Sequence, residues 1–242
     1  MTHKATSPDA VFRALLDAAS QPYRKAGSFA YHFARGKLAT DPVYRSTLEL
    51  GLLQRQQRIL DLGCGQALLS AWLLAAVHCY ERGTWPATWP PPLKAQTVRG
   101  IELMPRDVAR AHRALGTDCQ VTQGDIRNAA FGAADAVVIL DVLHYIAAHS
   151  QCEVLQRVHA ALPPGGLLLL RVGDAAGGLR FRITAWSDML PMLFRGHGFV
   201  ATHCRSVAQW RELLTECGFE SEATPMSRGT PFANVLLRAH AR

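Results

Sequence analysis

The sequence has little that would hold it in a membrane or crosslink it outside the cell. No apolar run comes near the roughly 20 residues that a membrane helix needs, and the longest, residues 67–77, contains Ser70. The first nine residues hold no apolar signal core. The six cysteines are scattered without a Cys-x-x-Cys pair, which is typical of a reducing compartment and argues against a zinc site. We therefore expect a cytoplasmic protein without a metal.

Charge is sparse and unevenly placed. Only 19% of the 242 residues are charged and 49% are hydrophobic, which is typical of one globular domain with a large core. The net charge is +7, of which residues 1–58 carry +5, residues 59–170 carry −1 and residues 171–242 carry +3. The basic flanks are either a solvated surface or a docking face for an acidic substrate or partner. No basic motif is interleaved with aromatic residues, so nucleic acid is not an expected partner.

Apolar runs alternate with helical patterns along most of the chain. Strands are predicted at residues 57–62, 97–103, 119–122, 136–140, 167–172, 219–224 and 234–239. Helices are predicted at residues 9–20, 42–54, 67–80, 105–115, 150–162 and 206–217. This alternation predicts an α/β fold with a parallel sheet and helices on both of its faces. The uninterrupted apolar runs at 136–140 and 167–170 indicate strands that are buried on both faces.

A glycine loop follows the first predicted strand. Asp61 stands just before Gly63, Cys64 and Gly65, and a run of helix-forming residues comes next. Such a strand, tight loop and helix bring backbone N–H groups and a helix N-terminus close to a ligand, which predicts a site for a nucleoside-like cofactor. The dinucleotide pattern G-x-G-x-x-G is incomplete because Leu68 stands at its third glycine. We interpret Cys64 as a small filler of the loop and not as a nucleophile.

The segment Asp61-Leu62-Gly63-Cys64-Gly65 resembles the first motif of class I S-adenosylmethionine-dependent methyltransferases. That family often has one more glycine, where Ala67 stands here. The resemblance covers about residues 56–240, and implies a Rossmann-like, seven-stranded, mostly parallel sheet whose last strand is antiparallel. It also implies S-adenosylmethionine as cofactor and S-adenosylhomocysteine as product. Residues 1–55 would form an N-terminal helical cap, and residues 56–242 the methyltransferase domain, with a substrate-side insertion at 174–200.

Acidic residues follow the second and third predicted strands, at the sheet edge where α/β folds bind ligands. Glu102 can accept hydrogen bonds from the ribose hydroxyls, with Leu103 beside it. It lies 39 residues after Gly63 because a proline-rich loop at 82–96 intervenes. The resemblance implies that Asp125 binds the adenine amino group and that Ile126 packs on the ring. The alternatives are a surface acid or helix cap for Glu102 and an ordinary turn residue for Asp125.

The segment after the fourth strand bears on the reaction. Asp141 lies where the family places the cationic sulfur, or caps the next helix. His144 is a candidate general base because its pKa lies near neutrality, and the alternative is a structural histidine. Methyltransferases that act on amino nitrogens usually have Asn/Asp-Pro-Pro-Tyr here, and Asp-Val-Leu-His stands in its place. This difference favours a small-molecule acceptor.

Further residues are candidates for contacts with the substrate or the cofactor. Arg171 and Asp174 end the fifth predicted strand and are expected to face the substrate. Arg180 and Arg182 follow, and they either bind a carboxylate or phosphate of the substrate or form a basic surface stretch. Near the N-terminus, Arg35, with Tyr31 as the other candidate, would meet the carboxylate of the cofactor if a helical cap closes over it.

The predicted function is methyl transfer from S-adenosylmethionine to a hydroxyl oxygen of a small molecule. Segments including Asp-Val-Leu-His-Tyr and Pro-Pro-Gly-Gly also resemble a bacterial group found with aryl-polyene or polyketide-like pathways. That resemblance implies an aromatic or carrier-bound substrate, and an acidic acyl carrier protein would suit the basic flanks. The alternatives are an NAD(P)-dependent oxidoreductase, which Leu68 and the lack of a Tyr-x-x-x-Lys pair disfavour, and a non-catalytic cofactor-binding module.

Overall fold

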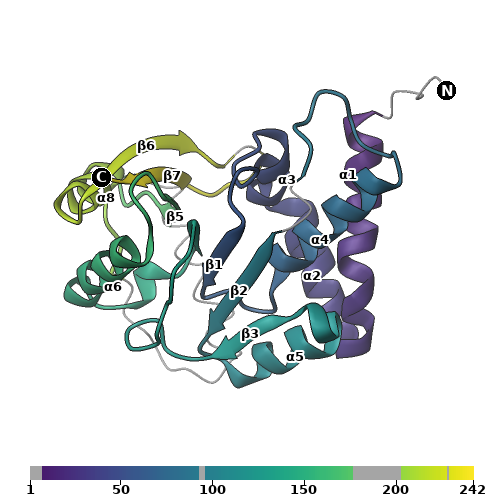
Figure 1. Ribbon diagram of the computed structural model, residues 1–242, viewed down its shortest axis with the longest axis horizontal. Coiled ribbons are helices and arrows are strands. Elements are labelled where there is room, and N and C mark those ends of the chain that lie inside the picture. The colour runs from purple at the N-terminus through teal and green to yellow at the C-terminus, as the bar shows by residue number, and fades with distance from the viewer. Residues whose placement is uncertain (1–6, 93–95, 177–202, 228) are drawn as a thin grey trace. The chain divides into compact units, whose positions relative to one another are not determined.

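The computed structural model describes residues 7–92, 96–176, 203–227 and 229–242. The chain divides into two compact units, Met1–Asp125 and Ile126–Arg242, each with its own strands and helices (Figure 1). The strand order in the seven-stranded sheet is β3-β2-β1-β4-β5-β7-β6. The predicted separation of a cap at residues 1–55 from a domain at 56–242 stays a prediction.

The first unit contains three parallel strands in the order β3-β2-β1. Its elements are α1 (Pro8–Ser20), η1 (Gln21–Ala26), α2 (Ser28–Thr40), α3 (Pro42–Glu49), β1 (Arg58–Leu62), α4 (Leu68–Glu81), β2 (Thr97–Glu102), α5 (Pro105–Leu115), η2 (Gly116–Asp118) and β3 (Gln120–Gln123). The register pairs Asp61 with Gly100 and Glu102 with Gln123. The carboxyl ends of these strands therefore carry the glycine loop and the predicted acids to one edge.

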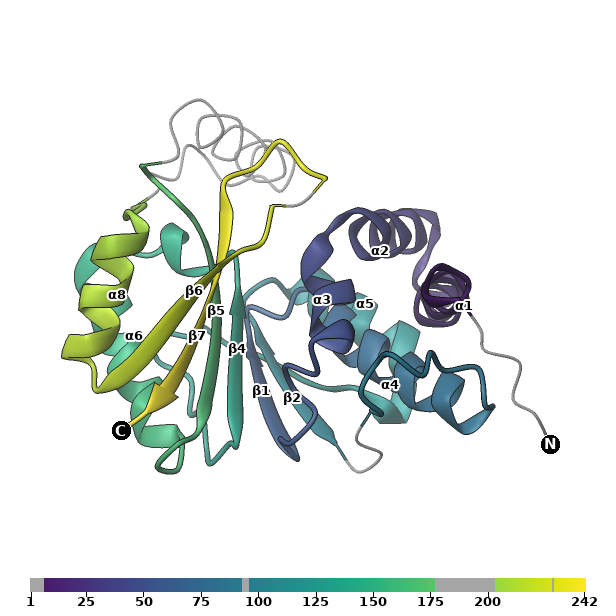
Figure 2. The same cartoon turned by 90° about the horizontal axis from the view of Figure 1, so that it is seen from above.

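The N-terminal helices pack on the helices that follow the strands. Helix α4 is buried over most of its surface, because α1, α2 and α3 all contact it (Figure 2). The indole N–H of Trp72, which is fully buried in α4, donates a hydrogen bond to the carbonyl of Tyr44 in α3 over 2.8 Å. Helix α3 ends at Glu49, earlier than the predicted 54, and the chain turns at Gly51 with φ +59°.

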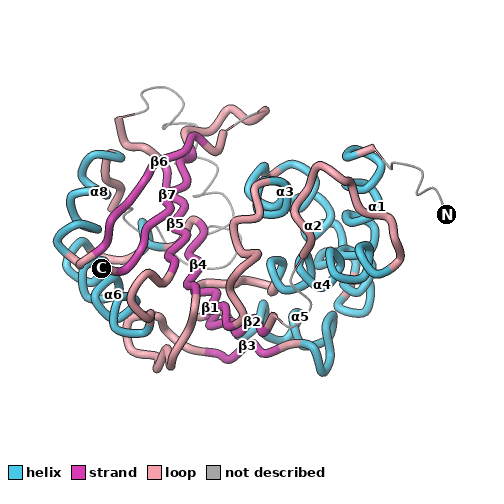
Figure 3. Tube along the Cα trace, turned by 45° about the horizontal axis from the view of Figure 1, so that its top comes forward, coloured by secondary structure: helices cyan, strands magenta, loops and turns pink. Residues whose placement is uncertain are grey.

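The second unit contains four strands in the order β4-β5-β7-β6 (Figure 3). Its elements are β4 (Ala136–Leu140), η3 (Leu143–Tyr145), α6 (Ala148–Ala161), β5 (Leu167–Gly173), α8 (Val207–Glu216), β6 (Phe219–Pro225) and β7 (Asn234–Ala241). Strands β4 and β5 are parallel, and β7 is antiparallel to both β5 and β6. The predicted fold class is thus confirmed: a mostly parallel, seven-stranded sheet whose last strand is antiparallel.

Helix ends in both units follow from local side-chain chemistry. The hydroxyl of Ser7 accepts a hydrogen bond from the N–H of Ala10 at the start of α1, where Pro8 occupies the first helical position. Ser206 and Gln209 form a capping box at the start of α8. These caps satisfy backbone donors that the first turn of a helix leaves without partners.

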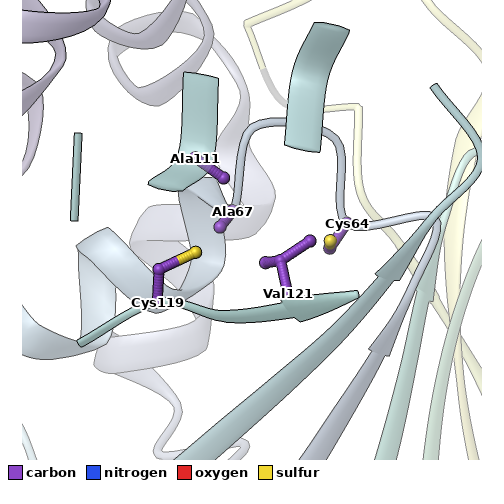
Figure 4. Packing of buried hydrophobic residues seen from close by; sticks show 5 residues of the cluster. All are labelled: Cys64, Ala67, Ala111, Cys119 and Val121. Atoms are coloured by element: carbon purple, nitrogen blue, oxygen red, sulfur yellow. The ribbon is translucent and has the colours of Figure 1, made fainter. Parts of the chain in front are cut away.

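A small apolar cluster lies beneath the glycine loop. Cys64 and Ala67 of the loop pack with Ala111 of α5, with Val121 of β3 and with Cys119, which precedes that strand (Figure 4). Gly100 in β2 leaves room for this cluster because it has no side chain. A Cβ atom placed there would lie 2.5 Å from the Cys64 sulfur and 3.0 Å from Val121 Cγ2. The loop therefore approaches β2 closely, and the Cys64 side chain fills the space that Gly100 leaves.

This packing predicts non-additive effects of changes at positions 64 and 100. Gly100→Ala should lower the free energy of unfolding by about 1–3 kcal/mol because the new methyl group clashes with the Cys64 sulfur. Cys64→Ala in the same chain should recover part of that loss, since it removes the atom in the way. Urea denaturation of the wild type, both single variants and the double variant measures the coupling. Strictly additive losses would contradict the close contact.

Candidate functional site

The loop between β1 and α4 has an unusual backbone. Gly63 and Gly65 have φ values of +73° and +56°, in the left-handed region that glycine enters without strain. Ala67 has φ +61°, which costs a residue with a side chain on the order of 1–2 kcal/mol. The N–H of Gly63 donates to the carbonyl of Ile101 over 2.8 Å, which ties the loop to the end of β2. A Cβ atom placed on Gly65 would meet no heavy atom within 4 Å, so a ligand can approach the backbone there.

Glu102 lies against this loop. One oxygen of its carboxylate accepts a hydrogen bond from the N–H of Gly65 over 2.8 Å, and the other accepts one from the N–H of Met104 over 2.8 Å. The side chain is 8% exposed. Because each carboxylate oxygen can accept more than one hydrogen bond, these contacts are compatible with the predicted role of Glu102 toward ribose hydroxyls.

Two other titratable groups lie near Glu102: Asp61 in β1 and Cys64 in the loop. Burial, and then the nearby Glu102 carboxylate, raise the pKa of Asp61 to about 7. Burial, followed by Asp61 and Glu102, also raises the pKa of Cys64 well above its usual value. A thiol in such surroundings stays protonated and is a poor nucleophile. This result agrees with the interpretation of Cys64 as a filler.

The predicted adenine-binding residues Asp125 and Ile126 follow β3 in the sequence. Asp125 is half-buried and closes the first unit, just after Gly124, whose N–H donates to the carbonyl of Glu102 over 3.0 Å. Leu103, beside Glu102, is 52% exposed, which is unusual for a large apolar side chain. Ile126 opens the second unit and is buried, and its carbonyl accepts a hydrogen bond from the Arg157 guanidinium. The roles of these residues toward adenine stay predictions.

An ion pair joins the ends of β4 and β5. The guanidinium of Arg171 donates from Nε to one oxygen of Asp141 over 2.9 Å and from Nη2 to the other, while the N–H of Asp141 donates to the Arg171 carbonyl. Arg171 is only 1% exposed, and Asp141 has φ +60°. The predicted contact of Arg171 with substrate stays a prediction, and its observed partner is Asp141.

His144 lies in η3, shortly after Asp141. The ring is 6% exposed, and burial lowers its pKa although the Asp141 carboxylate opposes this shift. The lowered pKa keeps the imidazole neutral near pH 7, which is the form that can accept a proton. Its backbone carbonyl accepts a hydrogen bond from the N–H of His203 over 2.8 Å. The choice between a general base and a structural histidine stays open.

The remaining predicted residues have contacts within the protein or lie outside the described residues. One oxygen of Asp174 accepts hydrogen bonds from the N–H groups of Ala176 and Val207, the latter at the start of α8. Arg35 in α2 forms an ion pair with Asp17 in α1 over 2.6 Å. Asp17 is thus the observed partner of Arg35, whose predicted contact with the cofactor stays a prediction. Arg180, Arg182 and most of the predicted insertion at 174–200 lie outside the described residues.

One contact to the loop was not predicted from the sequence. The hydroxyl of Tyr23 in η1 donates to the backbone carbonyl of Gln66 over 2.7 Å, although 43 residues separate them. Nothing in the sequence around Tyr23 indicates this contact. Among the described residues, no group of three or more histidine, cysteine, aspartate or glutamate side chains could hold a metal ion. The same residues include no helix that is long and apolar enough to cross a membrane.

The raised pKa of Asp61 predicts how stability changes with pH. The folded protein holds a proton on Asp61 between about pH 4 and pH 7, where the unfolded chain has lost it, so the contribution of this residue falls as pH rises through that window. Each pKa unit corresponds to about 1.4 kcal/mol. In urea titrations from pH 4.5 to 8, Asp61→Asn should lose less stability with rising pH than the wild type does. Parallel profiles of the two proteins would show that Asp61 titrates normally.

The Arg171–Asp141 ion pair predicts how variants at these two positions change the free energy of unfolding. Arg171→Met should lower the free energy of unfolding by about 3–5 kcal/mol, because it leaves the Asp141 carboxylate without its buried cation. Adding Asp141→Asn should recover much of that loss. A matched control is Arg45→Met, which breaks the more exposed ion pairs of Arg45 with Glu49 and Asp9 and should cost about 1 kcal/mol or less. Equal losses for Arg171→Met and Arg45→Met in urea denaturation would contradict a special contribution from the buried pair.

Comparison with known proteins places this geometry in a family. A model of the methyltransferase domain matches residues 31–224. A carboxy-S-adenosyl-L-methionine synthase of Chromohalobacter salexigens is 36% identical over 117 residues, which is 46% of this chain and 38% of the relative. The chain thus matches well under half the length of that relative.

Solved structures share the fold at lower identity. An O-methyltransferase family protein of Burkholderia thailandensis superposes with a TM-score of 0.61 at 19% identity, over 90% of this chain and 61% of that one. The magnesium protoporphyrin IX methyltransferase of Synechocystis, with bound SAH, gives a TM-score of 0.58 at 18% identity, over 90% and 92%. The family match covers most of the chain and agrees with the loop and the strand order. The chain therefore belongs to the methyltransferase domain family and has the fold of class I S-adenosylmethionine-dependent methyltransferases.

Proposed function

We propose that this chain transfers the methyl group of S-adenosylmethionine to a hydroxyl oxygen of a small molecule. The observation that carries the proposal is the contact of the Glu102 carboxylate with the N–H of Gly65 in the glycine loop of a methyltransferase domain. The open space beside the Gly65 backbone supports binding of the cofactor there. When bound, the cofactor would supply a methyl group on a cationic sulfur, and the sulfur would leave as a neutral thioether when a nucleophile attacks the methyl carbon.

In this proposal the first unit holds the nucleoside. The backbone of Gly63 and Gly65 lets the ligand approach, and the Glu102 carboxylate accepts hydrogen bonds from the ribose hydroxyls. The exposed Leu103 and the half-buried Asp125 would contact the adenine, with Ile126 packing on its face. Asp61, beneath the loop, contributes negative potential toward a cationic ligand when it is ionised.

The second unit would provide the groups that act on the acceptor. His144 would take the proton of the acceptor hydroxyl, and the bound cofactor would supply the methyl group to that oxygen. Its lowered pKa supports this role, because a neutral imidazole can accept a proton. Arg171 would hold the Asp141 carboxylate in place through the two hydrogen bonds of its guanidinium. Asp174 would contact the acceptor near the start of α8.

The acceptor in this proposal is an aromatic or carrier-bound intermediate, and the charge distribution supports an acidic carrier. Residues 1–58 carry a net +5 and residues 171–242 a net +3. Such flanks attract an acidic partner over a range set by the ionic strength, about 10 Å at 0.1 M. An acidic acyl carrier protein that presents the acceptor would fit this charge. Arg180 and Arg182 would add to the attraction from within the basic C-terminal part of the sequence.

A second candidate function is modification of the cofactor itself. The relative that is 36% identical over 117 residues is a carboxy-S-adenosyl-L-methionine synthase. In that case a second small molecule would donate a carboxyl group to S-adenosylmethionine, the product would be a carboxylated form of it, and S-adenosylhomocysteine would not form. Mass spectrometry of S-adenosylmethionine after incubation with the protein and a bacterial small-molecule extract separates the two candidates.

Cofactor binding predicts a specific thermal shift. S-adenosylhomocysteine at 100 times its dissociation constant should stabilise the protein by about 2.7 kcal/mol, and NAD should not.

Glu102→Gln should weaken binding of S-adenosylhomocysteine at least about tenfold, because a carboxamide offers one acceptor oxygen instead of two and carries no charge. Differential scanning fluorimetry and calorimetric titration measure both effects.

The control for this experiment is Glu153→Gln, which makes the same chemical change at an exposed position in α6. It should leave the affinity for S-adenosylhomocysteine unchanged. A shift with NAD alone would refute the proposed function in favour of a nicotinamide-dependent oxidoreductase. Binding of S-adenosylhomocysteine without any turnover of extract components would favour the non-catalytic module.

A further inference from the structure

Tyr23 is a buried tyrosine in the N-terminal part of the first unit that contacts the glycine loop. Its side chain is fully buried, and its hydroxyl donates to the backbone carbonyl of Gln66 over 2.7 Å. Burial raises the pKa of this hydroxyl, so it remains a protonated donor at neutral pH. The contact therefore persists across the pH range in which the protein would work.

The Gln66 carbonyl, which accepts the hydrogen bond from Tyr23, lies between two residues that determine the backbone geometry of the loop. Gln66 follows Gly65, whose N–H donates to Glu102, and precedes Ala67, which has a left-handed backbone. The N–H of Ala67, in the same peptide group as this carbonyl, donates to the carbonyl of Cys64 over 3.0 Å. The orientation of this one peptide group thus helps to set the direction of the Gly65 N–H and the start of α4.

The segment that contains Tyr23 packs against neighbouring helices of the first unit. The 3-10 helix η1 packs against α5. The guanidinium of Arg110 in α5 lies 4.5 Å from the ring centroid of Phe29 in α2, and that of Arg24 in η1 lies 4.2 Å from the ring centroid of Tyr31. These cation–π contacts link η1, α2 and α5. Tyr23 therefore extends from a firmly packed element to the loop.

The side chain of Gln66 adds a second observation. It is 1% exposed, and within the described part of the chain neither its amide nitrogen nor its amide oxygen has a hydrogen-bond partner. A buried amide of this kind is unfavourable. The side chain therefore gives the loop no polar anchor among the described residues, and the backbone contact from Tyr23 matters more for its position.

We propose that Tyr23 is a positioning residue for the cofactor: its hydroxyl holds the Gln66 carbonyl, and through it the loop that binds S-adenosylmethionine. The inference rests on the proposed function, and it couples packing of the N-terminal segment to occupancy of the cofactor site. Because such coupling is reciprocal, the bound cofactor also stabilises η1.

Tyr23→Phe removes the hydroxyl and keeps the ring. A matched control is Thr47→Val, which removes another buried hydroxyl that donates to a backbone carbonyl over 2.7 Å, in this case Val43 within α3. Both variants should lose similar thermal stability. Only Tyr23→Phe should raise the dissociation constant for S-adenosylhomocysteine, by about three- to tenfold, as expected for one hydrogen bond. Its KM for S-adenosylmethionine should rise while its kcat changes less than about twofold.

Hydrogen exchange of the wild type provides a test that needs no variant. Saturating S-adenosylhomocysteine should slow exchange at the amides of residues 21–26, and the effect should be smaller in Tyr23→Phe. Equal affinities of Tyr23→Phe and Thr47→Val, or no protection of residues 21–26 in the wild type, would overturn the inference. Failure of the wild type to bind S-adenosylhomocysteine at all would instead refute the proposed function.

Discussion

The rest of the candidate site depends on one hydrogen bond, from the backbone N–H of Gly65 to the carboxylate of Glu102. It joins the end of β2 to a loop that follows β1, and so fixes two strand ends against each other. The loop can make this contact because Gly63 and Gly65 enter a backbone region that other residues avoid. Beneath it, Gly100 leaves the space that the Cys64 side chain fills. Backbone geometry and close packing together thus fix the position of the glycine loop.

The two units deal with buried acids in different ways. In the first unit, Asp61 and Glu102 lie near each other, and burial keeps a proton on Asp61 at a pH where a free carboxyl is ionised. In the second unit, Asp141 is held by both nitrogen donors on one side of the Arg171 guanidinium. The first arrangement therefore lets the protonation of a buried acid change near neutral pH. The second fixes the Asp141 carboxylate at the end of β4, at the cost of burying the Arg171 guanidinium.

Local patterns in the sequence predicted most of the fold but few of the side-chain contacts. The apolar runs at 136–140 and 167–170 and the glycine loop are short-range signals, and the strands and loop appear where they indicate. The rule that α/β sheets bind ligands at the carboxyl ends of their strands placed Glu102 and the glycine loop at one edge of the sheet, but not their hydrogen bond. The contact of Tyr23 with Gln66 spans 43 residues, and the pair of Arg171 with Asp141 spans 30, so no local pattern reports either one. Likewise α3 ends early because tertiary packing and the turn at Gly51 outweigh helical propensity.

Ala67 restricts the backbone of the glycine loop, which would affect the entropy cost of binding a ligand there. Where related enzymes often have a glycine, this chain places a methyl group that restricts the backbone even before any ligand arrives. The free loop therefore samples fewer shapes, and its methyl group is held in the cluster with Ala111 and Val121. Less conformational entropy remains to be lost on association. For a ligand that bound this loop, the restricted backbone at Ala67 would thus be a form of preorganisation.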